Sequence, residues 1–496
     1  MSARSSRQKV THTFFLTGIG LGEMADPSPA PKTPWRDICL VALVPALDAV
    51  LRLGRIHPDE VFQFLEPAMN RAFGFGVVAW EWQEGLRNWF VPGLFAFILR
   101  ALEAIGIHDV QLRRAAIEVP QYALHVGMLG AVYRLAARRV TPSAARLTVW
   151  LVGLFPLVIW FGGRTMGESF SAAALVWGLE RLDADEKAER WAPVIAGLLL
   201  GLAEITRYGS AAVIVPALLW VLVTRRFRAF AYCAATGLLV AFALGLLDLL
   251  TWGHWFHSLA RYLDFNVISG RAGQQFGAER WHLAVSPLLP WYTTGFLVAP
   301  WALAGFAWWV KHRQTRVWLF VVPTAIYVVA ISATPHKELR FIYPALVLLT
   351  VAAAPACAQW VLSLRLAPMW QRASAVMLAG ATLSLFVVRT PFDVQRPEQF
   401  QLIVKASRSA TGFVLMNEGL WGSGGFFYLG KNLPWCPCDT PDDGCFQSGT
   451  RDPRFNRAIF YNDLLNPVRN EQSVAAFVAT GFHVVERRGE ATYLER

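Results

Sequence analysis

Charged residues are scarce in this chain. Asp, Glu, Lys and Arg make up only 16% of its 496 residues, whereas they make up about a quarter of an average soluble domain. Hydrophobic residues reach 55%, and 21 residues are Trp, which concentrates at membrane interfaces. This composition excludes an ordinary soluble domain and predicts an integral membrane protein.

Familiar soluble-enzyme motifs are absent as well. The sequence contains no GxGxxG, no Walker loop and no HExxH, so no motif indicates a dinucleotide, a nucleotide triphosphate or a catalytic zinc ion. No N-x-Ser/Thr sequon occurs, and no transporter-like internal repeat is evident. We expect no metal and no other cofactor.

Cysteine is rare, and its six residues fall into two groups. Cys39, Cys233 and Cys357 lie in apolar runs, where a thiol packs like a small hydrophobic side chain. The other group lies in one polar C-terminal loop: Cys436, Cys438 and Cys445. Its spacing lacks the paired ligands of a zinc site. In an oxidising compartment we expect a disulfide from the third of these cysteines to either of the other two.

The net charge of +11 raises the question of nucleic acid. The Arg and Lys residues gather in short loops between apolar runs, as the positive-inside rule requires of a membrane protein. The sequence therefore predicts no nucleic-acid partner.

The apolar runs indicate about 11–12 transmembrane helices, because most approach the roughly 20 residues that span a bilayer. They cover residues 36–54, 89–106, 114–136, 146–162, 168–182, 191–205, 207–224, 229–250, 288–310, 317–333, 341–363 and 373–389.

Basic clusters orient this bundle. They comprise Arg134, Arg138 and Arg139; Arg225, Arg226 and Arg228; Lys311, Arg313 and Arg316; and Arg365 and Arg372. If they face the cytoplasm, the loops 251–287 and 334–340 and everything after about 390 lie on the other side. If every apolar run crossed the membrane in turn, these loops could not all lie on their assigned sides. One run between 89 and 207 must therefore fail to cross the membrane.

Three parts follow from these patterns. Residues 1–34 read as a disordered tail, in which Met24 is an alternative start, and residues 35–389 as the transmembrane domain. That domain carries large external loops at about 55–88 and 251–287. Residues 390–496 alternate polar and apolar positions between turns, which predicts a small mixed α/β domain outside the cytoplasm.

The first external loop carries the most chemistry. It begins His57-Pro58-Asp59-Glu60 and continues to Gln63. Pro58 breaks the preceding helix, and the two acids open a new one. An ordinary helix start would also favour acids at these positions, so this segment alone leaves its role open.

Its continuation resembles a family of membrane mannosyltransferases of the GT-C superfamily, which use dolichyl- or polyprenyl-phosphate mannose to build GPI anchors and the N-glycan precursor. The resemblance recurs in order along nearly the whole chain. The matching segments are HPDEVFQFLEPA (57–68) with WEWQEGLRNWFVP (80–92); Phe265-Asn266, Phe276-Gly277 and Trp281-His282; HKELRF (336–341) with Tyr343-Pro344; and WGSGGFFYLGKN (421–432).

Two segments depart from the family's pattern. Its RTxxN appears as Arg164-Thr165-Met166-Gly167-Glu168, and its Arg-x-Thr appears as 207–209, Arg-Tyr-Gly. These departures leave the acceptor open. The composition favours a bacterial member in the cytoplasmic membrane; a eukaryotic member would lie in the endoplasmic reticulum membrane.

The resemblance implies an inverting transfer of mannose from the lipid-linked donor to a glycan or glycolipid, with an α-mannosidic bond and a non-cytoplasmic active site. A carboxylate must take the proton of the acceptor hydroxyl, and cations must stabilise the departing phosphate. We expect Asp59 to be the base, with Glu60 beside it. The expected donor-phosphate ligands are His336, Lys337, Arg340 and Arg207.

Other interpretations of these residues remain. Lys337 and Arg340 would also suit snorkelling at the interface, and Arg207 could form a structural pair with Glu204. Candidates for orienting the reacting groups are His57, Gln63, Trp281 and His282. His57 could instead be purely structural, and Trp80, Trp82 and Trp281 suit either sugar stacking or membrane anchoring.

Two other functions are compatible with the sequence. In a transporter or flippase of a lipid-linked glycan, intramembrane acids would form a path, and the candidates are Glu118, Glu168, Glu204 and Asp248. An inactive subunit of a glycan-assembly complex is the other rival, and the intact HPDE segment argues against it.

Overall fold

The computed structural model describes residues 32–282, 305, 307–312, 315–363, 396–416, 424–438, 444–461 and 467–496. Thr33–Arg496 form one compact unit. Nearly all of the predicted tail, most of the run 288–310, the run 373–389 and the basic pair Arg365 and Arg372 lie outside the described residues.

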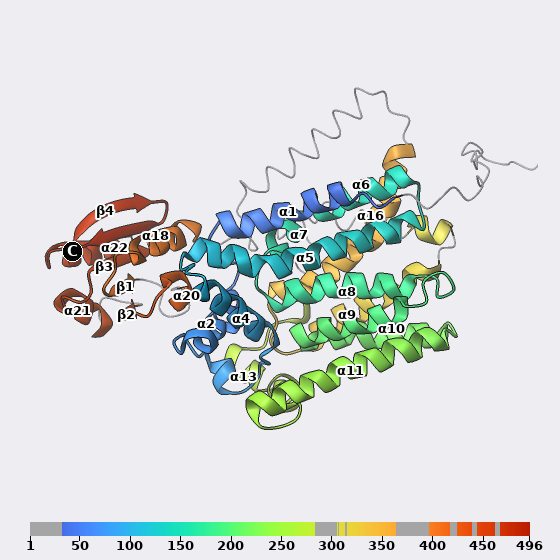
Figure 1. The fold of residues 1–496 in the computed structure, drawn as a ribbon, viewed down its shortest axis with the longest axis horizontal. Coiled ribbons are helices and arrows are strands. Elements are labelled where there is room, and N and C mark those ends of the chain that lie inside the picture. The colour runs from blue at the N-terminus through green and yellow to red at the C-terminus, as the bar shows by residue number, and fades with distance from the viewer. Residues whose placement is uncertain are drawn as a thin grey trace, which may run out of the picture. The chain divides into compact units, whose positions relative to one another are not determined.

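Long helices form most of this unit (Figure 1). They are α1 (Trp35–Leu51), α4 (Phe90–Ala104), α5 (Val110–Ala137), α6 (Pro142–Gly153), α7 (Pro156–Gly162), α8 (Gly167–Asp183), α9 (Ala192–Thr206), α10 (Ala211–Val223), α11 (Phe227–Trp252), α15 (Trp318–Ala333) and α16 (Tyr343–Ser363). Each falls on an apolar run of the sequence, which confirms the predicted helical bundle.

Length and composition single out fewer of these helices as membrane spans. Within the described residues, Phe227–Trp252 and Leu339–Ser363 are long and apolar enough, and α6 with α7 adds a third if this pair, bent by 61°, is one span. Several of the others are apolar but shorter than 18 residues.

Small residues let the helices approach closely. A Cβ at Gly197 in α9 would lie 1.9 Å from the hydroxyl of Thr236 in α11, and one at Gly201 would lie 2.7 Å from Val240. Both distances are far below van der Waals contact. The α9–α11 interface therefore depends on glycine, as helix pairs in membranes commonly do.

The basic clusters meet at one end of the bundle. Arg138, which follows α5, pairs with Asp183 at the end of α8 at 3.0 Å. Arg226 donates to the carbonyl of Leu182 at 2.6 Å, and Arg316 to that of Asp183 at 2.9 Å. Three clusters that the sequence assigns to one side of the membrane thus lie together.

Helix α4 starts and finishes at the other end. Asn88, just before it, donates to the carbonyl of Ile205 at 2.8 Å, where α9 ends. Glu103 in its last turn pairs with Arg113 in the first turn of α5 at 2.6 Å. Since α5 runs from there to Arg138, the run 89–106 is the one that returns without crossing the bundle.

The C-terminal part is a small mixed α/β domain, as predicted. Its helices are α18 (Pro397–Ser407), α20 (Gly425–Leu429), α21 (Gly444–Arg451) and α22 (Pro467–Val478), and its strands are β1 (Phe413–Met416), β2 (Trp435–Cys438), β3 (Arg457–Tyr461), β4 (His483–Arg488) and β5 (Ala491–Glu495). The sheet has the order β2-β1-β3-β5-β4. Its β2-β1-β3 part is parallel, and β5 pairs antiparallel with β3 and β4.

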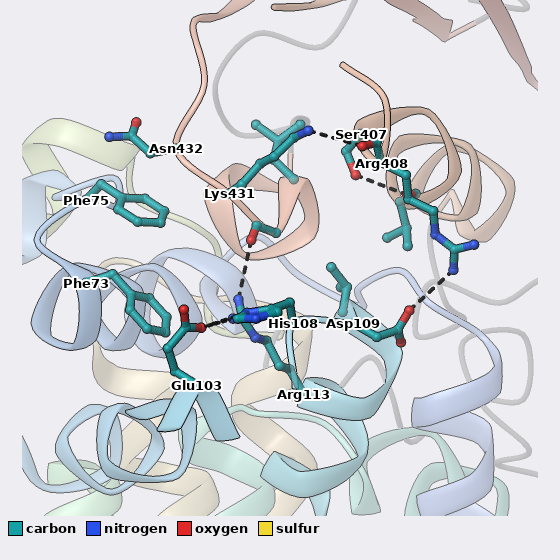
Figure 2. A pocket seen from close by; sticks show the side chains of 14 residues that line it. Phe73, Phe75, Glu103, His108, Asp109, Arg113, Ser407, Arg408, Lys431 and Asn432 are labelled. Carbon is teal, nitrogen blue, oxygen red and sulfur yellow. Dashed lines mark hydrogen bonds and ion pairs between the residues drawn. The ribbon is translucent and has the colours of Figure 1, made fainter. Parts of the chain in front are cut away.

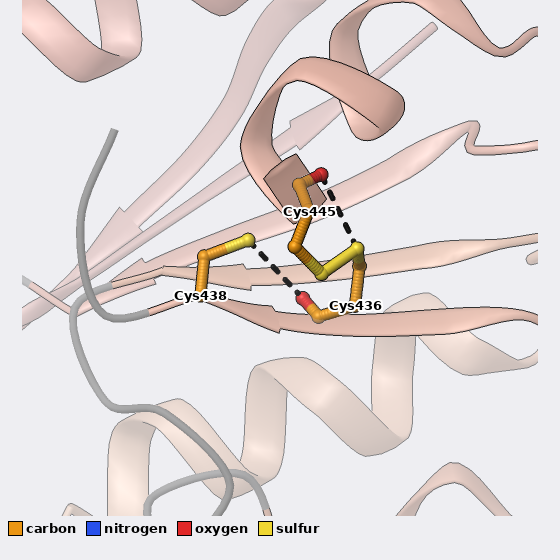
Figure 3. Close-up of side chains that lie close together, drawn as sticks. All are labelled: Cys436, Cys438 and Cys445. Carbon is orange, nitrogen blue, oxygen red and sulfur yellow. Dashed lines mark hydrogen bonds between the residues drawn. A yellow bond between two sulfur atoms is a disulfide. The ribbon is translucent and has the colours of Figure 1, made fainter. Parts of the chain in front are cut away.

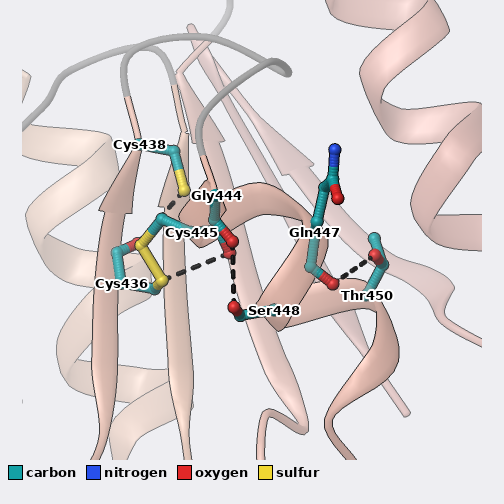
Figure 4. The surroundings of a disulfide bond; sticks show 7 residues. All are labelled: Cys436, Cys438, Gly444, Cys445, Gln447, Ser448 and Thr450. Atoms are coloured by element: carbon teal, nitrogen blue, oxygen red, sulfur yellow. Dashed lines mark hydrogen bonds between the residues drawn. A yellow bond between two sulfur atoms is a disulfide. The ribbon is translucent and has the colours of Figure 1, made fainter.

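A disulfide joins the end strand of this sheet to a helix. It connects Cys436 in β2 with Cys445 in α21, whose Cα atoms lie 5.5 Å apart (Figures 3 and 4). Cys438 lies beside it, outside the bond, and donates to the carbonyl of Cys436 at 3.6 Å. Of the two pairings that the sequence allowed, the structure contains the one through Cys436.

Candidate active site

The HPDE segment ends in a helical turn that aims its two acids in different directions. Pro58 accepts backbone hydrogen bonds that start a π-helical turn, Glu60–Leu65, which leads directly into α2 (Glu66–Phe73). Asp59 faces a cluster of polar side chains and is 20% exposed. Glu60 points the other way and is buried. A π-turn is rare outside functional segments.

Arg340 is the centre of that cluster. Its guanidinium lies 2.6 Å from Asp59 Oδ2, 2.6 Å from Glu338 Oε2 and 3.5 Å from Glu168 Oε1. Arg207 pairs with the same oxygen of Glu168. Two arginines thus face three carboxylates, and the donors of Arg340 fan out across all three, as a planar guanidinium permits.

Two histidines complete the cluster. His57 lies with Nδ1 3.1 Å from Asp59 Oδ1 and Nε2 3.2 Å from Glu338 Oε2, so it bridges the two acids. His336 Nε2 lies 3.2 Å from the other oxygen of Glu338. Gln63, one turn after Asp59, donates to Asp59 Oδ2. The structure therefore brings Asp59 together with five residues that the sequence singled out: His57, Gln63, Arg207, His336 and Arg340.

The arginine controls the charge state of the acids. Burial alone would raise the pKa of Asp59, but the charges of Arg340 and His57 outweigh it and hold that pKa well below its ordinary range. The same balance of burial against Arg340 lowers the pKa of Glu338. Both groups are carboxylates at neutral pH, and Asp59 is a weak base while Arg340 stays beside it.

Two expected site residues have other partners. Glu60 accepts the backbone N–H of Ile56 and lies 4.0 Å from Arg164, so it holds the HPDE loop against the bundle. Lys337 donates to the backbone carbonyls of Glu279, at 2.8 Å, and of Thr334. Its ammonium thus joins two loops.

Arg207 has a different partner from the one considered for its structural interpretation. It pairs with Glu168 rather than with Glu204, and its guanidinium lies 4.8 Å from the centroid of the Phe341 ring. Glu168 was missed as a site residue, although it stands where the sequence departs from the family's pattern. Glu338 was missed inside the HKELRF segment, where its position between two cations was the available signal.

In the second external loop, Phe276 contacts the cluster, whereas the sequence had singled out Trp281 and His282. The Phe276 ring lies 5.2 Å from that of His336. Trp281 is 67% exposed and meets His282 edge to face, with ring centroids 5.8 Å apart. Within the described part of the chain, neither Trp281 nor His282 hydrogen-bonds to the cluster. Trp82 is buried against Trp89, which favours packing over sugar stacking.

An apolar cavity of about 310 Å³ lies between α4, α9 and α11, and its walls include Phe90, Leu202, Ile205 and Leu244. Ile205 lies in the last turn of α9, two residues before Arg207 in the chain, and none of the described residues that line the cavity belongs to the cluster. The apolar walls suit part of a hydrocarbon tail.

The acids that would serve a transporter do not form a path. Glu118 pairs with Arg114 at 3.0 Å, and Asp248 accepts from Ser258 at 2.6 Å. Glu168 belongs to the cluster around Arg340. Three of the four candidate acids thus have a local partner, which disfavours the transporter.

The bundle and the mixed domain define a helical protein with apolar, membrane-type helices and a small C-terminal α/β domain. The fold is similar to that of ArnT from Cupriavidus metallidurans bound to undecaprenyl phosphate, with a TM-score of 0.55 over 94% of this chain and 98% of that one. At 14% sequence identity this likeness shows the fold alone.

The chain belongs to the Alg9-like mannosyltransferase family, whose model matches residues 38–394. GPI mannosyltransferase 3 of Yarrowia lipolytica is 28% identical over 72% of this chain and 69% of its own length. GPI alpha-1,2-mannosyltransferase 3 of Danio rerio is 27% identical over 62% and 56%. The chain thus spans little more than half the length of the second relative. The predicted family and the predicted mannosyltransferase class are confirmed.

Proposed function

We propose that this protein transfers mannose from polyprenyl- or dolichyl-phosphate mannose to a hydroxyl of a glycan or glycolipid, with inversion to an α-linkage. The observation that carries the proposal is the 2.6 Å pair of Asp59 and Arg340, which places a base and a phosphate ligand side by side. The relatives named GPI mannosyltransferases favour a glycolipid acceptor.

The donor's lipid chain occupies the apolar cavity, and its phosphate lies against Arg340 and Arg207. The acceptor oxygen attacks the anomeric carbon while the bond from that carbon to the phosphate oxygen breaks. The leaving polyprenyl phosphate keeps the electron pair and gains a negative charge, which the two arginines stabilise. His336 adds a further donor on the same side.

Asp59 takes the proton of the acceptor hydroxyl. When the donor phosphate replaces Asp59 beside Arg340, Asp59 loses the larger of the two charges that hold its pKa down, and its basicity rises toward that of an ordinary carboxylate. Donor binding thus prepares the base. Glu168 and Glu338 keep Arg340 in place during this exchange, because each holds a separate nitrogen of the guanidinium.

The active site lies on the non-cytoplasmic side in this proposal. The cluster lies at the end of the bundle opposite the basic clusters, which the positive-inside rule assigns to the cytoplasm. The disulfide of the C-terminal domain supports an oxidising compartment for that end of the protein. A bacterial cytoplasmic membrane and an endoplasmic reticulum membrane both meet this condition.

The test is transfer of labelled mannose by the purified full chain in detergent. Polyprenyl-phosphate mannose and GDP-mannose are offered separately, with a panel of mannosyl acceptors. We expect product from the lipid donor alone, and we expect α-mannosidase to release the label. Transfer from GDP-mannose alone, or product resistant to α-mannosidase, contradicts the proposal.

A further inference from the structure

A second cavity lies away from the acid–arginine cluster. It encloses about 550 Å³ between the end of α2, the connection from α4 to α5, and residues 429–432 of the C-terminal domain (Figure 2). Its volume is within the range of about 300–1,000 Å³ that is typical of small-molecule sites. Nothing in the proposed reaction uses it.

The lining combines aromatic rings with charged and amide groups. Phe73 and Phe75 stack on each other with their centroids 5.8 Å apart and lie along one side. Lys431 and Asn432 come from the C-terminal domain, and Asp109 comes from the start of α5. Flat apolar rings beside several hydrogen-bonding groups suit a pyranose, which has an apolar C–H face and a rim of hydroxyls.

Ion pairs link these walls. Arg113 is almost fully buried, pairs with Glu103 at 2.6 Å, donates to the carbonyl of Gly430 at 3.3 Å and lies 5.2 Å from the Phe73 ring. Arg408 pairs with Asp109 at 3.3 Å. Because the arginines already have carboxylate partners, the cavity favours an uncharged ligand over a phosphate.

The cavity is linked directly to the catalytic segment. The helical stretch that begins at Asp59 ends at Phe73, about 20 Å further along at the rise of an α-helix. Midway, Glu66 accepts the backbone N–H of Phe427 at 2.7 Å, which ties the segment before residues 429–432 to the same helix. One helical stretch thus joins the catalytic segment to a wall of this cavity.

We propose that this cavity binds a sugar of the acceptor glycan that is remote from the reacting hydroxyl. This inference rests on the proposed function. It makes the junction of the first external loop with the C-terminal domain a specificity site: the enzyme recognises an oligosaccharide rather than a single terminal sugar.

The test compares linear α-mannotriose with methyl α-mannoside as acceptors of the purified full chain. Phe75→Ala removes a ring, and Asn432→Ala removes an exposed amide that makes no hydrogen bond within the described part of the chain. Phe97→Ala, on the exposed face of α4, is the matched control. We expect both cavity variants to raise the ratio of the trisaccharide KM to the monosaccharide KM, by about three- to tenfold for the ring.

Saturation-transfer NMR of mannotriose with the same proteins separates this inference from the proposed function. If no variant transfers mannose but the wild-type binding signal is lost in Phe75→Ala, the transferase reaction fails and the sugar site stands. An unchanged KM ratio in both variants, an equal KM rise for the two acceptors, or displacement of mannotriose by inorganic phosphate overturns the sugar site.

Discussion

Replacing Asp59 by Asn keeps the shape of the side chain and removes its capacity to accept a proton. In the structure Asp59 Oδ2 accepts from Arg340 at 2.6 Å and from Gln63, and an amide oxygen in the same place can accept from both. Arg340 also retains Glu338, at 2.6 Å. The fold and the position of the arginine should therefore survive the substitution.

The expected loss of turnover is large. General base catalysis contributes about a hundredfold to ten-thousandfold, and the nearby acid cannot replace it, because Glu60 is buried and faces Ile56 and Arg164. Asp59→Asn should thus lower kcat by about that factor. It should leave the donor KM close to wild type or lower it, because the donor phosphate no longer competes with a carboxylate for Arg340.

The assay is steady-state transfer from labelled polyprenyl-phosphate mannose, with thermal unfolding as the check on folding. Asp185→Asn is the matched control, since Asp185 is exposed in the loop after α8, at the end of the bundle that holds the basic clusters. Near-normal turnover in Asp59→Asn would refute the assignment. If Glu60→Gln then abolished turnover in a folded protein, the roles of the two acids would be exchanged.

Three further substitutions follow from the same geometry. Arg340→Gln should raise the donor KM, with a loss of about 2–4 kcal/mol in kcat/KM. An unchanged donor KM would mean that Arg340 only snorkels at the membrane interface and does not bind the donor. Lys337→Met should lower the unfolding temperature while the donor KM stays near wild type, because its bonds go to backbone carbonyls such as that of Glu279; a rise in donor KM alone would reverse that view. Burial raises the pKa of Glu66 from 4.5 to about 7, although Phe427 N–H donates to it. A raised pKa favours the folded state while the group is protonated, so this stability is lost between about pH 4.5 and 7. Glu66→Gln should remove that slope from unfolding temperatures measured across this range, and an unchanged slope would contradict it.

The fold was largely predictable because apolar runs determine where helices form. The sequence also implied that one run between 89 and 207 does not cross, since basic loops must lie on one side. It could not identify α4 as that run. The contacts that return α4 to its starting end are made by Asn88 and Glu103 with residues distant in sequence or on the next helix, and an apolar pattern contains no such information.

The site was predictable only in part, for a similar reason. The charged motifs HPDE and HKELRF indicated which residue types meet, and Asp59 does meet Arg340. Which member of a motif faces the cluster depends on the local turn. The π-turn separates Asp59 from Glu60, and the bend before Leu339 sends Lys337 to backbone carbonyls while Arg340 reaches the acids.

Glu168 gives the departure from the family's pattern a physical meaning. Where the resemblance expects an amide, this chain has a carboxylate that pairs with Arg207 and lies 3.5 Å from Arg340. An amide could accept from these arginines but would neutralise neither, whereas Glu168 offsets one of the two positive charges. In the proposed reaction, the donor phosphate meets arginines that are held in place but partly neutralised, and it displaces Asp59 from Arg340 when it binds. Competition for Arg340 then links occupation of the donor site to release of the base.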